Sequence, residues 1–177
     1  MKKIFIILSI VIVSALYSNA ADDIVPAKGF TWGGDIGSTI DFSSSGKSSI
    51  DAEMNFGYKC PYFKVIGVGA GIHTCLSSNN TFIPVFALLR TSFSSKPKLC
   101  FLELKGSYSF NSLGNVSQSA PFGSIGLGCN LYRNSKFSSH IILSYNFYKI
   151  NDFTTDDNKN VDAEDMHAVS IRIGINF

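Results

Sequence analysis

Strict alternation of apolar and polar side chains over the last ten residues is the feature that most constrains this chain. The apolar set is Val169, Ile171, Ile173, Ile175 and Phe177, and the polar set is Ser170, Arg172, Gly174 and Asn176. A period of two indicates a β-strand with one apolar and one polar face. The apolar face of such a strand must be covered either by the interior of the protein or by the hydrocarbon of a membrane.

Seven earlier segments show the same alternation. They are residues 29–42, 49–59, 62–74, 82–93, 99–110, 122–132 and 137–148, with residues 168–177 as the eighth. Each is about the ten residues that a tilted transmembrane strand needs. Beyond the first twenty residues no apolar run reaches the length of a transmembrane helix, so a membrane crossing would require a closed barrel.

The predicted connections differ in length in a regular order. Short connections are expected at residues 60–61, 94–98 and 133–136, and long ones at residues 43–48, 75–81, 111–121 and 150–165. Short periplasmic turns that alternate with longer extracellular loops are typical of outer-membrane barrels. The sequence therefore predicts an all-β fold, an eight-stranded antiparallel up-and-down transmembrane β-barrel with both chain ends on the periplasmic side.

The first twenty residues have the pattern of a cleavable signal peptide. Lys2 and Lys3 precede an uncharged apolar run, and small residues end at Ala20. We expect a signal peptide at residues 1–20 and the barrel domain at residues 21–177. Removal of Lys2 and Lys3 from the fifteen Lys and Arg residues leaves thirteen, which balances the thirteen Asp and Glu residues. The mature chain has no basic excess to bind nucleic acid, so we expect no such partner.

These features together resemble the small outer-membrane β-barrel family, which includes OmpX/OmpA-type barrels and PorT-like "porin family" chains. The resemblance rests on the signal peptide, the eight alternating strands and three short stretches. The stretches are Ile83-Pro84-Val85-Phe86, Arg90 downstream of it, and Ile175-Asn176-Phe177. It implies a location in the cell outer membrane, contact with outer-membrane lipid, and recognition of Phe177 by the barrel-assembly machinery. It implies no activity beyond a structural, adhesion or surface-interaction role through the extracellular loops, with an unknown extracellular partner.

Charged residues at inward positions of the strands are the candidate functional set. They are Asp35, Glu53, Arg90, Glu103, Lys105 and Arg172. An eight-stranded barrel is just wide enough to be filled by its own side chains, and buried charges must pair. We interpret the set as a polar network that plugs the lumen, and a small conducting pore is the alternative.

The order of the chain suggests particular pairs within this set. Counting outward from the turn at residues 94–98 makes Arg90 and Glu103 diagonal neighbours on adjacent strands. Asp35 and Arg172 are expected at similar depth where the first and last strands meet. Pro84 cannot donate a hydrogen bond to a neighbouring strand, so we expect a bulge or an end effect there.

Aromatic residues near strand ends are expected to form girdles at the headgroup region of the bilayer. They are Phe30, Trp32, Tyr58, Tyr62, Phe93 and Phe137. The alternative fold is a soluble periplasmic or secreted barrel of lipocalin type that binds a small apolar ligand. Gly29-Phe30-Thr31-Trp32 misses the lipocalin Gly-x-Trp spacing by one residue, which favours the membrane barrel.

Sites of catalysis or metal binding are not indicated. The acidic stretch at residues 150–165 lacks the central glycine of a calcium loop, so we interpret it as a solvated loop. His73, His140 and His167 accompany no nucleophile motif. We expect no enzyme, no cofactor and no metal.

Four cysteines would reach an oxidising compartment with the exported chain. They are Cys60, Cys75, Cys100 and Cys129. Their spacing matches no zinc or redox motif. Three of them lie in or beside apolar strand positions, so we favour small apolar side chains on the lipid face over a disulfide. A bridge would need two Cα atoms within about 7 Å of each other.

Overall fold

The protein is described from a computed structural model, which covers most of the chain after residue 27. The described residues are 28–42, 48–60, 63–76, 81–92, 100–113, 116–134, 136–150, 153–154, 160–161 and 164–177. The predicted signal peptide at residues 1–20 and most of the acidic stretch lie outside them. No helix within these ranges is long and apolar enough to cross a membrane.

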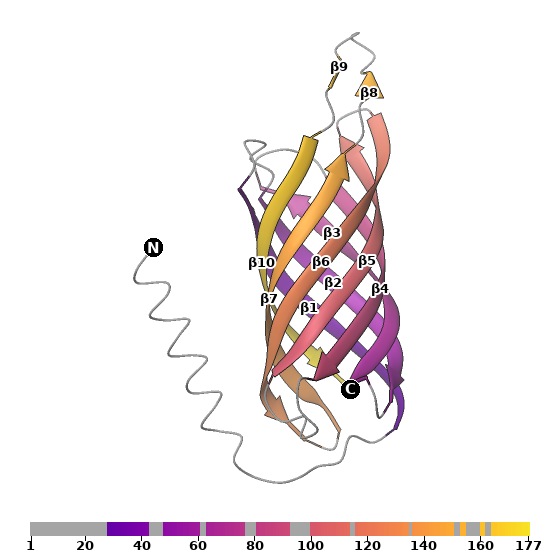
Figure 1. Cartoon of the computed structure of the whole chain (residues 1–177), viewed down its shortest axis with the longest axis vertical. Helices are drawn as coiled ribbons and strands as arrows, with labels where there is room; N and C mark the ends of the chain where they lie inside the picture. The colour runs from indigo at the N-terminus through magenta and orange to yellow at the C-terminus, as the bar shows by residue number, and fades with distance from the viewer. Residues whose placement is uncertain are drawn as a thin grey trace, which may run out of the picture.

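Eight long strands and one two-stranded hairpin make up the described structure. They are β1 (Gly29–Asp41), β2 (Ser49–Lys59), β3 (Val65–Cys75), β4 (Thr81–Ser92), β5 (Cys100–Leu113), β6 (Val116–Arg133), β7 (Ser138–Ile150), β8 (Phe153–Thr154), β9 (Asn160–Val161) and β10 (Glu164–Asn176). Each long strand pairs antiparallel with its neighbours, and β10 pairs with β1 to close the barrel (Figure 1). The predicted eight-stranded antiparallel barrel is confirmed.

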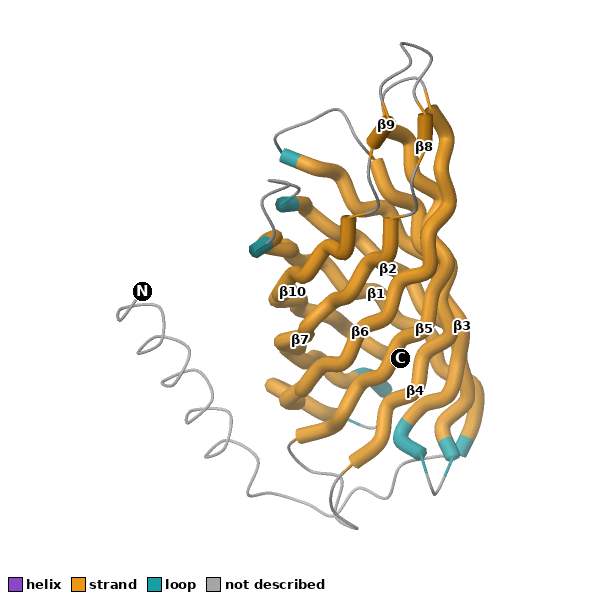
Figure 2. The backbone as a smooth tube through the Cα atoms, turned by 45° about the horizontal axis from the view of Figure 1, so that its top comes forward, coloured by secondary structure: helices purple, strands orange, loops and turns teal. Residues whose placement is uncertain are grey.

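The closing seam joins the first and last long strands over most of their length. Its register runs from the Gly33–Asn176 pair to the Asp41–Ala168 pair without a break. All the long strands are tilted and coil around one lumen (Figure 2). Closure leaves no unpaired strand edge in the barrel wall, which satisfies the backbone hydrogen bonds between strands.

The two faces of the wall have opposite chemistry. Apolar side chains point outward, with exposed fractions of 68% for Ile36, 60% for Val68 and 57% for Leu127. Charged side chains point inward, and Arg90 is 0% exposed. The strand faces assigned from the alternation are therefore confirmed. This arrangement does not suit the lipocalin-type alternative, in which an apolar lumen would face a small ligand.

Aromatic side chains gather on the outer face near the short turns. Trp32 stacks on Phe177 with ring centroids 4.5 Å apart, and Phe137 lies 6.2 Å from the same Phe177 ring. Tyr132 extends this group through Phe137 at 5.3 Å. Of the predicted girdle residues, Tyr62 and Phe93 lie outside the described residues. The others occupy this end of the barrel, where a headgroup region would meet the wall.

Two predicted loops are wrong in extent. Residues 111–121 were expected to form a long loop, yet β5 continues to Leu113 and β6 begins at Val116. Backbone pairing between these two strands continues through this stretch up to the Leu113–Val116 pair, although its side chains do not alternate. The stretch at residues 150–165 is also partly strand, since it contains β8 and β9 and the first residues of β10.

Proline in β4 interrupts one ladder without a bulge. Pro84 pairs with Ser109 of β5 in an unbroken register. On the β3 side the paired residues stop at Ala70–Val85 and resume at His73–Phe82 in the same register. The lack of an amide hydrogen at Pro84 therefore interrupts the pairing of β4 with β3 but not its pairing with β5. The bulge lies elsewhere, between Asn130 and Tyr132 of β6.

The four cysteines occupy three kinds of position. Cys100 is exposed and Cys129 is partly exposed on the outer face, as the apolar interpretation predicts. Cys75, predicted to begin a loop, is instead the last residue of β3 and is buried on the lumen side. Cys60 directly follows β2, and its sulfur contacts the carbonyl oxygen of Phe63 at 3.3 Å.

The face assignment predicts a depth-dependent cost for charge on the outer wall. Ile171→Lys, halfway along the outer face of β10, should lower the free energy of unfolding by about 2–4 kcal/mol, because the ammonium would lie against hydrocarbon. Ile50→Lys, near the loop end of β2, should cost only about 0–1 kcal/mol. Urea unfolding of both variants in lipid vesicles measures the difference, and equal losses would contradict the assignment.

Candidate functional site: the charged lumen

Five strands bring the six predicted charges into the lumen. Asp35 comes from β1, Glu53 from β2, Arg90 from β4, Glu103 and Lys105 from β5, and Arg172 from β10. All six are buried, the most exposed being Lys105 at 5%. Each occupies an inward position of its strand because the side-chain period is two. Three carboxylates thus face three cations.

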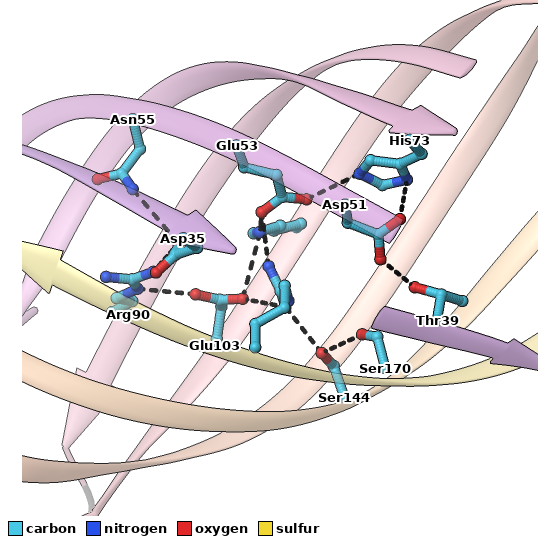
Figure 3. Close-up of polar contacts among 12 residues, drawn as sticks. Asp35, Thr39, Asp51, Glu53, Asn55, His73, Arg90, Glu103, Ser144 and Ser170 are labelled. Carbon is cyan, nitrogen blue, oxygen red and sulfur yellow. Dashed lines mark hydrogen bonds and ion pairs between the residues drawn. The ribbon is translucent and has the colours of Figure 1, made fainter. Parts of the chain in front are cut away.

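Glu103 lies at the centre of this network, between the two arginines. The Nε of Arg90 donates to Glu103 Oε2 at 2.7 Å, and the Nη2 of Arg172 donates to Glu103 Oε1 at 2.7 Å. The Nη1 of Arg172 also donates to Glu53 Oε2 at 2.7 Å. Lys105 bonds the same Glu53 carboxylate and lies 3.5 Å from Glu103 Oε1. Every one of these cations therefore touches at least one carboxylate, as Figure 3 shows for Arg90 and Glu103.

Asp35 anchors the network at the end nearer the short turns. Its Oδ2 accepts a hydrogen bond from Arg90 Nη2 at 2.9 Å, and its Oδ1 lies 2.7 Å from His140 Nε2. Asn55 Nδ2 approaches the same carboxylate at 3.5 Å. The aspartate thereby links β1 to β4 and to β7 across the lumen.

His73 continues the network toward the loop end. Its Nε2 lies 3.2 Å from Glu53 Oε1, and its Nδ1 lies 3.3 Å from the hydroxyl of Tyr148 and 3.6 Å from Asp51 Oδ1. Asp51 also accepts a hydrogen bond from Thr39 (Figure 3). These contacts join β1, β2, β3 and β7, so the polar network extends from Glu53 toward the loop end of the lumen.

Aromatic side chains close the lumen above the network, on the loop side. Phe122 stacks on Tyr148 with centroids 4.2 Å apart, and Phe82 lies 6.2 Å from the Tyr148 ring. Ala168, which is fully buried, completes this layer. The gap between this layer and the charges, which Phe122, Arg172 and Lys105 help to line, is too narrow to admit a water molecule.

A second closure lies on the short-turn side. The Phe101 ring meets His140 edge-on at 5.7 Å, and Lys64 places its Nζ 4.0 Å from the centre of the same ring. Lys64 also donates to Asn130 Oδ1 at 2.8 Å. Burial of its ammonium, with Arg90 nearby, holds the pKa of Lys64 well below its ordinary value. The predicted third strand, residues 62–74, put Lys64 on the same outward face as Ile66, whereas β3 begins only at Val65 and Lys64 lies in the turn before it.

Phe177, the predicted assembly signal, is tied to β1 at the barrel seam. Its backbone N donates to Trp32 O at 2.8 Å, and its carbonyl oxygen accepts from Thr31 Oγ1 at 2.5 Å and from Lys59 Nζ at 3.3 Å. Its ring stacks on Trp32 on the outer face. The aromatic side chain therefore lies at the barrel surface while its backbone belongs to the wall.

The two pairs suggested by the sequence differ in outcome. Arg90 and Glu103 do pair, but they are directly opposite rather than diagonal. The ladder ends at Ser92–Phe101, which shifts the register by one residue from a turn at residues 94–98. Asp35 and Arg172 lie at similar depth, because Gly37 is the partner of Arg172. The hydrogen bonds of Asp35 nevertheless go to Arg90, His140 and Asn55 rather than to Arg172.

Several members of the network were missing from the predicted set. They are Asp51, Asn55, His73, His140, Ser144 and Tyr148. All occupy inward positions, and polar character at such positions was the signal that could have identified them. In this arrangement the charged side chains of the lumen form ion pairs with one another. Among the described residues, no group of three or more His, Cys, Asp or Glu side chains is placed to hold a metal ion.

Removal of one carboxylate at the centre should be costly. Glu103→Gln should lower the free energy of unfolding by about 3–5 kcal/mol, because Arg90 and Arg172 would lose a buried opposite charge. Lys136→Gln, on the exposed turn between β6 and β7, should change it by less than about 0.5 kcal/mol. Denaturant titration in detergent micelles compares the two, and a loss for Glu103→Gln as small as that control would contradict the network.

A close approach at Gly174 makes a second prediction. A Cβ there would collide with Asp35 Oδ1 and lie 2.7 Å from His140 Nε2, whereas a Cβ at Gly106 would meet nothing within 4 Å. Gly174→Ala should therefore cost about 1–3 kcal/mol by overpacking. Gly106→Ala, on the outer face, is the matched control and should be neutral within about 0.5 kcal/mol. Thermal unfolding of both variants measures this, and equal midpoints would count against the tight lumen.

Comparison with known proteins finds likeness in structure only. No family model matches the chain, and no curated protein sequence matches it. Neisserial surface protein A (NspA) superposes with a TM-score of 0.61 at 15% identity, covering 84% of this chain and 96% of that one. The N-terminal β-barrel domain of Pseudomonas aeruginosa OprF gives 0.50 at 10% identity, covering 85% and 100%. A structure from the de novo design of transmembrane β-barrels gives 0.50 at 12% identity, covering 86% and 98%. The chain is a closed eight-stranded antiparallel barrel similar to transmembrane β-barrels.

Proposed function

We propose that this protein is an outer-membrane barrel whose lumen is sealed by paired charges and whose loop end carries its function. That function is structural, adhesive or another form of surface interaction, without catalysis or cofactor. The observation that carries the proposal is the inverted wall, with Ile36, Val68 and Leu127 exposed outside and Arg90 fully buried inside. Water is a poor solvent for such an exterior, whereas bilayer hydrocarbon suits it.

The state of the lumen supports a role at the ends of the barrel rather than through it. Glu103 and Glu53 hold both arginines by direct ion pairs, and the Phe122–Tyr148 stack lies above them. An ion crossing the barrel would have to break several of these contacts at once. A small pore therefore has less support than a sealed barrel.

The loop end offers more surface for a partner than the turn end. β5 and β6 pair to Leu113–Val116, and the β8–β9 hairpin stands near them beyond the barrel wall (Figure 1). An antiparallel hairpin that extends past the membrane presents backbone and side chains in a fixed geometry. We propose that this end meets an extracellular partner whose chemistry is unknown.

The other proposed partners are the lipid of the outer membrane and the barrel-assembly machinery. The apolar outer wall would contact the lipid. The exposed ring of Phe177, beside Trp32 at the seam, supports recognition of β10 by an assembly factor that acts where the barrel closes. The signal-peptide pattern of residues 1–20 agrees with export.

Two measurements on one preparation test the proposal. The protein should sediment with outer membranes after a carbonate wash, and unboiled samples should migrate faster in SDS gels than boiled ones. Planar-bilayer recording of the folded protein should show no regular, porin-sized openings. Recovery in the soluble fraction would support the soluble-barrel alternative, and regular large openings would support a pore.

A further inference from the structure

Cys100 and Cys129 face each other across β5 and β6 on the outer wall. They are direct partners in the ladder, and their sulfur atoms lie 2.9 Å apart. Cys100 is exposed and Cys129 is partly exposed. We propose that these two residues form a disulfide in the exported protein, an inference that rests on the proposed location only for the oxidising compartment.

The backbone geometry of the pair suits a bridge. Residues directly opposite in an antiparallel ladder have Cα atoms about 4.5–5.5 Å apart, inside the range of about 4.4–6.8 Å found for disulfides. Both side chains point to the same face of the sheet because the two residues are in register. A bonded pair needs sulfur atoms about 2.05 Å apart, so the sulfurs must approach by less than about 1 Å. Side-chain rotation supplies that movement without a shift of the strands.

The other two cysteines lie elsewhere in the barrel. Cys60 directly follows β2 near the short turns, with its sulfur 3.3 Å from Phe63 O. Cys75 ends β3 at the loop end and is buried on the lumen side. These two lie at opposite ends of the barrel, and neither faces the Cys100–Cys129 pair on the outer wall. The bridge is therefore assigned to Cys100 and Cys129 alone.

The bond would form by thiol–disulfide exchange with a protein oxidant that carries its own disulfide. The thiolate of Cys100 attacks one sulfur of that disulfide, forms a mixed disulfide and releases the second oxidant sulfur as a thiolate. The thiolate of Cys129 then attacks the Cys100 sulfur and releases the oxidant. The two cysteines lose two protons and two electrons, and the oxidant leaves as a dithiol.

The bridge would fix the base of the longest hairpin in the barrel. Cys100–Cys129 is the last pair of the β5–β6 ladder at the short-turn end, and Leu113–Val116 is the last at the other. Just past Cys129, β6 shifts register against β7 between Asn130 and Tyr132. A covalent link at this point holds β5 and β6 in register where regular pairing ends, and so steadies the hairpin that projects toward the proposed partner.

Thiol counting on the unfolded, unreduced protein tests the bridge directly. Wild-type protein isolated from membranes and then denatured without reductant in the presence of an alkylating reagent, which reaches the buried Cys75, should carry two labels, on Cys60 and Cys75. Proteolysis without reductant should release a peptide that joins Cys100 to Cys129 and is lighter by two hydrogen atoms than the separate peptides. A link from Cys100 to any other cysteine would overturn the proposal, and so would four labelled cysteines together with no bridge in the refolded protein.

A refolded pair of variants separates this inference from the question of location. Protein refolded in micelles with oxidised glutathione should form the same bridge in C60S/C75S and none in C100S/C129S. Reductant should lower the folded-to-unfolded ratio of C60S/C75S by roughly 30- to 700-fold, the range typical of disulfides, and should leave C100S/C129S unchanged. Free thiols or glutathione adducts at both positions of C60S/C75S would overturn the bridge. A bridge formed here but absent from cell-derived protein would instead count against export.

Discussion

The ion pairs between Glu103 and the two arginines are the interaction on which the rest of the barrel depends. Arg90 and Arg172 come from strands that are distant in sequence, and both place a nitrogen 2.7 Å from an oxygen of this carboxylate. A charge buried without a partner costs several kcal/mol, so each strand must present its charge at the right depth. The barrel diameter set by eight strands is what allows side chains from opposite walls to meet.

Small residues in the wall make room for these large side chains. Gly128 lies beneath the Phe101 ring, and Gly174 lies beneath the contact of Asp35 with His140. The aromatic closures then exclude water from both sides of the charges. This strengthens each ion pair and raises the free-energy cost of removing one of its partners. One alternating pattern thus accounts for both sides of the wall. Its polar residues form the rigid lumen, and its apolar residues form the outer surface.

Alternation predicted most of the fold, because the period of two fixes a face for every strand residue. It assigned Ile171 to the outside and Arg172 to the inside correctly. It could not fix where strands end, since the alternating segments stop at Phe110 and resume at Phe122, yet β5 and β6 pair as far as Leu113 and Val116. Nor could it give contacts across the lumen, such as that of Asp35 with His140, because these depend on strand stagger around the whole barrel. The pairing of Cys100 with Cys129 could not be predicted for a related reason. It depends on the register of β5 against β6, which the turn between these strands sets.

The strand that closes the barrel seam also completes the charge network of the lumen. Arg172 belongs to β10, and its guanidinium forms ion pairs with Glu53 of β2 and Glu103 of β5. A curved sheet that still lacked β10 would expose two incompletely neutralised carboxylates to its open side, and it would keep water there. Only the arrival of β10 beside β1 can dry the interior, because the same step closes the hydrogen-bond ladder and completes the charge balance. We therefore expect a sheet that lacks β10 to be much less stable than the closed barrel, because it loses the seam ladder and the charge balance together.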